Sequence, residues 1–173
     1  MASKNQRQFW DLSEKDDWRT PLELVNDLAK ATDGIDTDPC AHPKSSIGDV
    51  NNYRLEDGQN GLELPWMGTV FVNPPFGHKA KWLNRTIGAV ENGNARTVIV
   101  LTPDSTDTKS WWHEYIAPHS NLVCFLEGRL SYLDSDGVKQ GSPTFGTAIS
   151  VFGYYPPMLI ETLQEWGHVV RTM

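Results

Sequence analysis

Short apolar runs alternate with amphipathic stretches along this chain, and the alternation constrains its fold more than any other feature. The clearest run is TVFV at residues 69–72, where β-branched and aromatic residues stop at two prolines, as at the end of a buried strand. Such runs also predict strands within 34–42, at 96–102, at 121–126 and at 145–153. Helical spacing predicts helices over 21–32, 79–91, 107–117 and 157–166. Together they indicate an α/β fold, with a mostly parallel sheet covered by helices on both faces.

The domain organisation follows from length and from local composition. A chain of 173 residues favours one domain, which we place at 18–173, after a polar and aperiodic N-terminal arm at 1–17. Residues 42–68 are predicted to be irregular, and Asp136-Gly137 marks a turn or small hairpin. The polar start and the absence of a long apolar run predict no membrane segment and a cytoplasmic protein with free cysteines.

The net charge of -7 argues against a partner as anionic as nucleic acid. The acidity is concentrated, however: residues 1–75 hold 13 of the 22 acidic residues and only 7 of the 15 basic ones. Lys79 and Lys81 follow the Pro-Pro motif closely. They form either a local basic rim or an ordinary solvated helix face.

Polar motifs follow the predicted strands at the points where those strands end. These motifs are DPCA at 38–41, NPPF at 73–76 and TPDS at 102–105. In open α/β sheets, ligands bind beyond the carboxyl ends of the strands. We therefore expect the fold to bring the three motifs together at one site.

The NPPF motif suits chemistry on a conjugated amine, such as the exocyclic amine of a nucleobase. The side-chain oxygen of Asn73 and the carbonyl of Pro74 can each accept one N–H, which directs the nitrogen lone pair toward an electrophilic methyl group. Pro74 and Pro75 stiffen the loop, and Phe76 offers a ring on which an extruded base can stack. In the structural alternative, the prolines only end a strand and Phe76 fills the core.

The chain resembles the phage-type DNA N6-adenine methyltransferases over about residues 17–155, with the motifs in similar order. The matching motifs are WRTP at 18–21, DTDPCA at 36–41, NGL at 60–62 with Trp66, VNPPF at 72–76, GRL at 128–130, SP at 142–143 and FGTA at 145–148. The resemblance implies a Rossmann-like class I methyltransferase fold. It also implies S-adenosyl-L-methionine as cofactor and adenine N6 in DNA as the methylated group.

The resemblance also implies roles for individual residues. It places the target adenine among Asn73, Pro74, Pro75 and Phe76. It places the cofactor among Trp18, Thr20, Pro21, Asp38, Pro39, Cys40 and Ala41, with Asp57 or Asn60 at the cofactor adenine. A helix that starts at Pro21 favours the methionine carboxylate, and Asp38 is suited to the ammonium.

Each cofactor assignment has a structural alternative. Thr20 and Glu23 form a capping box in the sequence, and both interpretations of Thr20 can hold together. Asp38 is alternatively a turn residue before Pro39, and Cys40 suits packing better than nucleophilic chemistry. Asp57 and Asn60 can equally belong to a surface loop.

Candidate DNA contacts come from basic residues near the motifs and in two connecting segments. The candidates are Lys79, Lys81, Arg129 and Lys139. Because no room remains for a recognition domain, segments 104–119 and 129–146 are expected to read a short or relaxed target site. The acidic charge predicts salt-sensitive nonspecific binding, so a homodimer or the base pocket would supply the affinity. Arg129 alternatively forms a surface ion pair, and for Trp111 and Trp112 we favour packing.

The leading hypothesis is in-line methyl transfer to adenine N6 in DNA, with activity that depends on Asn73 rather than on a histidine base. The histidines show no metal-ligand spacing, so no metal is assigned. Other planar nitrogens remain open as substrates: glutamine amide in protein, cytosine N4 and adenine in RNA. A non-catalytic module that binds DNA or cofactor also remains open, although the intact Asn73 argues against it.

Overall fold

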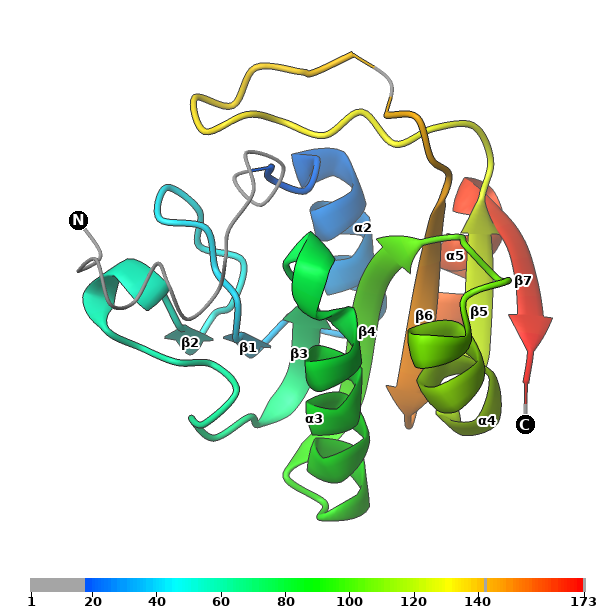
Figure 1. Ribbon diagram of the computed structural model, residues 1–173, viewed down its shortest axis with the longest axis horizontal. Coiled ribbons are helices and arrows are strands. Elements are labelled where there is room, and N and C mark those ends of the chain that lie inside the picture. The colour runs from blue at the N-terminus through cyan, green and yellow to red at the C-terminus, as the bar shows by residue number, and fades with distance from the viewer. Residues whose placement is uncertain (1–17, 142, 173) are drawn as a thin grey trace.

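Seven strands form a single sheet that has helices on both of its faces (Figure 1). The computed structural model describes residues 18–141 and 143–172, so the predicted arm at 1–17 lies outside the described residues. The strands are β1 (Thr37–Asp38), β2 (Asn51–Asn52), β3 (Gly68–Val72), β4 (Ala95–Pro103), β5 (Leu122–Leu126), β6 (Thr147–Gly153) and β7 (Gly167–Arg171). Their order across the sheet is β2-β1-β3-β4-β6-β5-β7.

The sheet is mixed, and the prediction of a mostly parallel sheet is not confirmed. β1 pairs in parallel with β2 and β3, and β3 with β4, whereas β6 runs antiparallel to β4 and β5, and β7 antiparallel to β5. A parallel return requires a crossover, usually through a helix. The described residues between β5 and β6 contain no helix, so β6 returns in the opposite direction. Helix α5 (Pro157–Trp166) supplies a crossover after β6, and β7 therefore runs in the same direction as β6.

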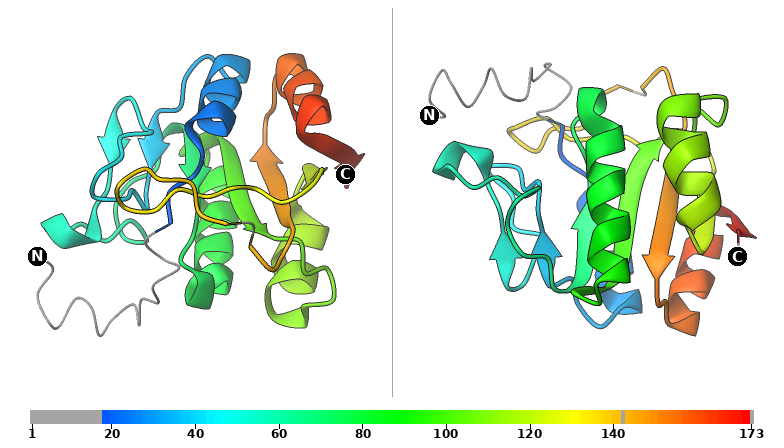
Figure 2. Two further views of the ribbon diagram at one scale, coloured as in Figure 1. Left: turned by 90° about the horizontal axis from the view of Figure 1, so that it is seen from above. Right: turned by 60° about the horizontal axis from the view of Figure 1, so that its bottom comes forward.

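The helices cover the two faces of the sheet as the sequence predicts (Figure 2). They are α2 (Leu22–Ala31), α3 (Lys79–Glu91), α4 (Ala117–His119) and α5, with short 3-10 helices η2 (Leu55–Asp57) and η3 (Phe76–His78) and the π-helix η4 (Lys109–Ile116). Helices α3 and η4 pack on one face, against Val70, Val72, Val98 and Val100. Helices α2 and α5 pack on the other face, against Phe71, Ile99 and Leu101. Within the described residues, no helix is long and apolar enough to span a bilayer.

The segment that leaves β5 crosses above the carboxyl ends of β3 and β4 (Figures 1 and 2). Leu133 pairs antiparallel with both Arg19 and Lys139, which confirms the small hairpin around Asp136-Gly137. Gly137 has a φ of 81°, a conformation that favours glycine at this turn. The segment before α2 and the hairpin are thus joined above the end of the sheet.

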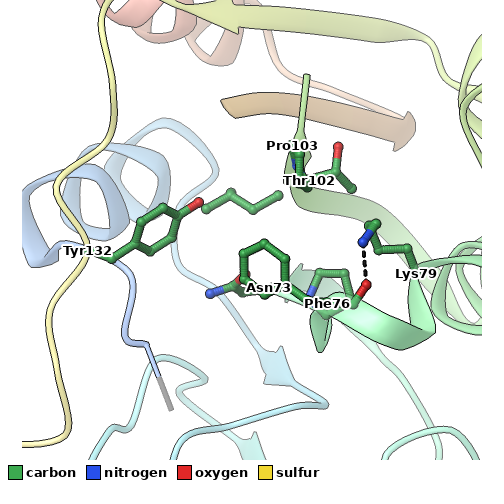
Figure 3. Close-up of a pocket in the computed structure, with 8 residues that line it drawn as sticks. Asn73, Phe76, Lys79, Thr102, Pro103 and Tyr132 are labelled. Atoms are coloured by element: carbon green, nitrogen blue, oxygen red, sulfur yellow. Dashed lines mark hydrogen bonds between the residues drawn. The ribbon is translucent and has the colours of Figure 1, made fainter. Parts of the chain in front are cut away.

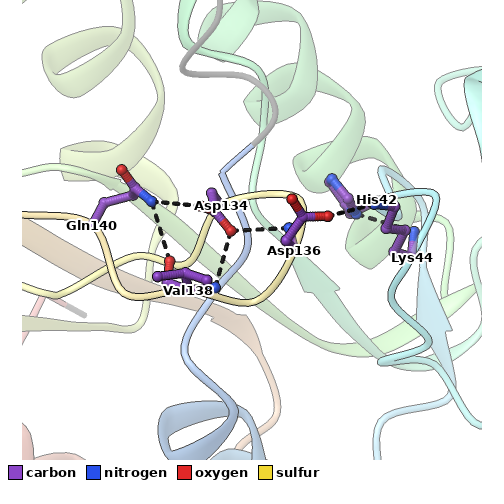
Figure 4. A network of polar contacts seen from close by, with 6 residues as sticks. All are labelled: His42, Lys44, Asp134, Asp136, Val138 and Gln140. Atoms are coloured by element: carbon purple, nitrogen blue, oxygen red, sulfur yellow. Dashed lines mark hydrogen bonds and ion pairs between the residues drawn. The ribbon is translucent and has the colours of Figure 1, made fainter.

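A polar network holds the hairpin together and connects it to a neighbouring loop (Figure 4). A carboxylate oxygen of Asp134 accepts the backbone N–H groups of Asp136 and Val138, each at 2.9 Å. The Lys44 ammonium pairs with the Asp136 carboxylate at 2.8 Å. Both side chains of that ion pair are largely exposed, so the pair defines the contact between the loops more than it stabilises the fold.

Candidate functional site

A small pocket opens where β3 and β4 end (Figure 3). Its lining combines the NPPF motif with the end of β4 and with the hairpin segment. The lining residues are Asn73, Pro74, Phe76, Lys79, Leu101, Thr102, Pro103 and Tyr132. The parallel register between β3 and β4 explains this meeting, because Val72 lies opposite Val100 and the two motifs continue side by side.

The side chain of Asn73 is held by a residue from a distant part of the chain. Its amide nitrogen Nδ2 donates to Oγ1 of Thr20 at 3.3 Å, and Thr20 is buried. The predicted capping box is wrong, because α2 begins after Pro21 with no side-chain hydrogen bond at its cap. The Thr20 hydroxyl orients Asn73 instead, and the bond leaves the Asn73 oxygen Oδ1 for another partner.

The backbone of the same motif is held at its other carbonyls. The Cys40 thiol donates to the carbonyl of Asn73 at 3.1 Å, and the N–H of His78 donates to the carbonyl of Pro75 at 3.1 Å. Burial raises the pKa of the Cys40 thiol well above its ordinary value, and the nearby Asp38 raises it further, so the thiol stays protonated and can donate. Cys40 of the DPCA motif thus contacts Asn73 directly, and Thr102 and Pro103 of the TPDS motif line the same pocket as Asn73. All three predicted strand-end motifs therefore meet around Asn73.

Aromatic rings form a continuous wall beside the pocket. The ring centres of Phe76 and Phe145 are 5.2 Å apart, those of Phe145 and Tyr132 are 6.5 Å apart, and those of Tyr132 and Trp18 are 5.6 Å apart. The hydroxyl groups of Tyr132 and Thr147 are hydrogen-bonded at 3.3 Å. Sequence reasoning missed Tyr132 and Phe145 as site residues. The sequence signal that could have identified them is the presence of two aromatic residues in the largely polar connection between β5 and β6.

Lys79 is half-buried and belongs to the pocket rather than to an exposed basic rim. Its ammonium lies 5.4 Å from the ring centre of Phe76 and 5.5 Å from that of Trp111, and it donates to the carbonyl of Phe76. Trp111 and Trp112 belong to η4, and both are buried in the core that η4 and α3 form with the sheet, so the packing interpretation is confirmed for both. Lys79 thus connects the motif loop to this packed layer.

Asp38 ends β1 as a buried carboxyl group. Its Oδ1 accepts the N–H of Cys40 at 3.2 Å, and its side chain is only 3% exposed. Burial raises the pKa of Asp38 to about 7, although the hydrogen bond from Cys40 and the charge of Arg54 oppose this shift. A cationic group placed beside this carboxyl would stabilise its charged form.

The remaining cofactor candidates differ in their burial and in their contacts with the DPCA loop. A Cβ on Gly61 would lie 1.7 Å from the carbonyl oxygen of Pro39, so the NGL motif packs directly on the DPCA loop. Asn60 uses Oδ1 to accept the N–H of Leu62 at 3.1 Å, and Asp57 is exposed in η2. Ala41 is buried, whereas Trp18 and Pro21 are half-buried.

The other candidate DNA contacts are exposed. Lys81 lies on α3, Lys139 lies in the hairpin, and Arg129 lies after β5. Arg129 donates from Nη1 to the backbone carbonyl of Pro143 at 2.7 Å. Across residues 18–141 and 143–172, no group of three or more His, Cys, Asp or Glu side chains is placed to hold a metal ion.

The chain matches the model of a known protein family. The model described as DNA N-6-adenine-methyltransferase (Dam) matches residues 10–159, which is most of the chain. No curated protein matches the chain.

Proposed function

Because the chain belongs to the DNA N-6-adenine-methyltransferase (Dam) family, which methylates adenine N6 in DNA, we propose that the pocket beside Asn73 holds the target adenine. The observation that carries this proposal is the hydrogen bond from Asn73 Nδ2 to Thr20. With Nδ2 turned toward Thr20, Oδ1 is the acceptor atom that Asn73 offers to a ligand. An oxygen acceptor is what an amine donor requires.

The second acceptor is the carbonyl of Pro74. The neighbouring carbonyls of Asn73 and Pro75 already accept bonds from Cys40 and His78, and Pro74 itself lines the pocket. Two acceptors that each take one N–H draw the amine nitrogen toward tetrahedral geometry and free its lone pair. As the N–C bond formed, the C–S bond of the donor would break and leave a neutral thioether. The nitrogen would become cationic and release one proton to water, so the step requires no strong base.

Phe76 provides the ring against which the extruded base stacks. Its position is fixed from two sides, by the edge-on contact with Phe145 and by the ammonium of Lys79. Such cation–ring contacts and aromatic pairs orient a side chain without a covalent connection. The loop therefore presents Phe76 in a defined orientation before the base enters.

S-adenosyl-L-methionine is the methyl donor in this proposal, and it would supply an electrophilic methyl group on a sulfonium centre. The residues fit its polar end: the buried Asp38 carboxyl accepts the N–H of Cys40 and forms no salt bridge within the described residues, so it suits the ammonium. The free backbone N–H groups at the start of α2 suit the carboxylate, with Trp18, Thr20 and Pro21 adjacent. Pro39, Cys40 and Ala41 shape the loop, and Asn60 is better placed than the exposed Asp57 for the cofactor adenine.

The parallel half of the sheet supports a Rossmann-like class I methyltransferase arrangement. β2, β1, β3 and β4 run in parallel, and the proposed cofactor and base sites follow β1 and β3. Ligands bind at this edge in doubly wound folds. The antiparallel half lies on the far side of β4 and carries no proposed cofactor residue.

DNA contacts are proposed for Lys81, Arg129 and Lys139, all of which are exposed. The hairpin that carries Lys139 crosses above the ends of β3 and β4 (Figure 1), and its compact size favours a short target site. Because few basic residues are available, we expect affinity from the base pocket or from a homodimer.

The direct test is identification of the product. Purified protein is incubated with unmethylated DNA and S-adenosyl-L-methionine, and the digested nucleosides are analysed by mass spectrometry. We expect N6-methyldeoxyadenosine from DNA and no methylated nucleoside from RNA. Methylated cytosine, methylated RNA or a methylated protein amide as the only product would contradict the proposal.

A further inference from the structure

Thr102 carries a buried hydroxyl group that has no hydrogen-bond partner in the described part of the chain. Its side chain is only 2% exposed. Other buried threonines are satisfied: the hydroxyls of Thr37, Thr86 and Thr97 donate to the carbonyls of Met67, Trp82 and Tyr154. Since an unpaired buried hydroxyl destabilises the fold, the exception at Thr102 requires an explanation.

The orphaned hydroxyl belongs to a residue of the pocket wall. Val72 of β3 lies opposite Val100 of β4, so the register continues to bring Pro74 beside Thr102. Thr102 and Pro103 stand across the pocket from Asn73 and Phe76 (Figure 3). A base whose amine meets Asn73 and Pro74 would therefore bring its ring edge toward Thr102.

We propose that Thr102 positions the target adenine by donating its hydroxyl hydrogen to a ring nitrogen of the base. The inference rests on the proposed placement of the adenine beside Asn73. Adenine carries two ring acceptors close to its amine, N1 and N7. The hydroxyl oxygen is inaccessible in the free protein, so the contact requires the Thr102 side chain to turn about χ1 toward the pocket (Figure 3). With both amine hydrogens taken by Asn73 and Pro74, the ring nitrogen on the Thr102 side then becomes the partner that the hydroxyl lacks in the free protein.

Such a contact would contribute to the choice of base. Guanine has a carbonyl in place of the amine, so its O6 would oppose the acceptors of Asn73 and Pro74. Cytosine has an amine and a neighbouring ring acceptor but carries C–H where adenine has N7. A contact at N7 would therefore separate adenine from cytosine, whereas a contact at N1 would not.

The target adenine is first located by sequencing methylated DNA. The test then compares variants of the protein on DNA in which that adenine is replaced by 1-deazaadenine or 7-deazaadenine. The isosteric Thr102→Val removes the hydroxyl, and Thr102→Ser retains it. Ser150→Ala is the matched control, because Ser150 is also buried and unpartnered on β6 but does not line the pocket. The Asn73→Ala variant tests separately whether this pocket holds the target adenine.

We expect Thr102→Val to lower kcat/KM about 10-fold on ordinary adenine, since a buried acceptor on the base then lacks its donor. Thr102→Ser and Ser150→Ala should stay within about 3-fold of the parent protein. One of the two deaza bases should reduce the kcat/KM of the parent protein about 10-fold. The same base should not reduce the kcat/KM of Thr102→Val any further, because the hydroxyl and the ring nitrogen act as a coupled pair. The melting temperature of Thr102→Val should not fall, because the hydroxyl has no partner to lose.

Either of two results would overturn the proposal. One is unchanged kcat/KM in Thr102→Val, and the other is an equal response of parent and Thr102→Val to both deaza bases. If Asn73→Ala remains active, the pocket is not the base site, and the proposed function fails together with this inference. If Asn73→Ala is inactive while Thr102→Val equals the parent, the inference alone fails.

Discussion

The amide nitrogen of Asn73 donates to the hydroxyl oxygen of Thr20 at 3.3 Å, although 52 residues separate the two in the sequence. The contact gives the motif amide a defined orientation, with nitrogen toward Thr20 and oxygen toward the pocket. Thr20 precedes the helix whose N-terminus is proposed to hold the cofactor carboxylate. One short segment therefore supports both proposed halves of the site.

Replacement of Thr20 tests whether this residue orients the amide or caps the helix. Thr20→Val removes the acceptor with little change of shape, so we expect methyl transfer to fall about 10-fold through loss of a hydrogen bond. The free energy of unfolding should fall by no more than about 1 kcal/mol, the contribution of the hydrogen bond to Asn73, because the Thr20 side chain makes no cap bond. Thermal unfolding and single-turnover rates would measure both effects, with Thr20→Ser as the control that keeps the hydroxyl. A loss of about 1 kcal/mol in stability with full activity would instead indicate a helix cap.

The Cys40 thiol is predicted to be unreactive at pH 8. Burial raises its pKa well above the ordinary value, and thiolate is the species that reacts with disulfide reagents and alkylating agents. Modification of Cys40 should therefore become fast only in denaturant. We expect the same of Cys124, because burial raises the pKa of its thiol to about 12. Mass spectrometry after timed labelling would follow each cysteine. Rapid labelling of native Cys40 at pH 8 would contradict a protonated donor to Asn73.

Asp38 is predicted to make the stability of the ligand-free protein fall as pH rises from about 4 to 7. Its pKa is about 7 in the fold against 3.8 for the ordinary carboxyl, so the native state retains a proton that the unfolded chain releases within this interval. The slope is at most about 1.4 kcal/mol per pH unit. Denaturant titrations at several pH values would measure it. Asp38→Asn should remove this slope, and an unchanged slope in that variant would assign the pH dependence to other groups.

Cofactor affinity should have the opposite pH dependence. If the cofactor ammonium pairs with Asp38, the carboxyl must ionise on binding, so affinity should rise with pH until about 7 and then level off. Calorimetry in buffers of different ionisation enthalpy would show proton release below that pH. Asp38→Asn should bind more weakly and without this proton release. Equal binding by the variant would place the ammonium elsewhere.

The aromatic wall is predicted to act through the ring of Tyr132 more than through its hydroxyl. Tyr132→Phe loses the bond to Thr147 but keeps the contacts with Trp18 and Phe145, so activity should fall less than about 3-fold. Tyr132→Ala removes the ring that links the hairpin to the pocket, and we expect at least a 10-fold loss. Methylation rates at saturating DNA, with melting temperatures as the folding control, would distinguish the two variants.

The sequence predicted the regular elements where apolar periodicity was strong. The helices at Lys79–Glu91 and Pro157–Trp166 have the predicted bounds, and the strand after Gly68 ends before the prolines as expected. Strand β2 was missed because it consists of Asn51 and Asn52, a residue type that is rare in strands. Strand β7 was missed because Gly167 begins it directly after α5, with no intervening loop.

The candidate site was predictable only in the part that strand ends determine. The meeting of the motifs at Cys40 and Asn73 follows from where parallel strands end. The contributions of Tyr132 and Phe145 depend on the path of a connection without regular secondary structure, which periodicity does not describe. The reversal of β6 has the same origin, because the connection before it lacks the helix that a parallel return would need.

The central claim is that Asn73 Oδ1 accepts an N–H of the target adenine, and the single-turnover rate of Asn73→Ala tests it most directly. The rate is measured with saturating DNA and cofactor, beside Asn73→Asp, which keeps an oxygen acceptor, and with affinities for both ligands determined independently. We predict at least a 100-fold slower methyl transfer in Asn73→Ala, affinities within about 3-fold of the parent, and measurable activity in Asn73→Asp. A folded Asn73→Ala protein that methylates adenine at the parent rate would contradict the account.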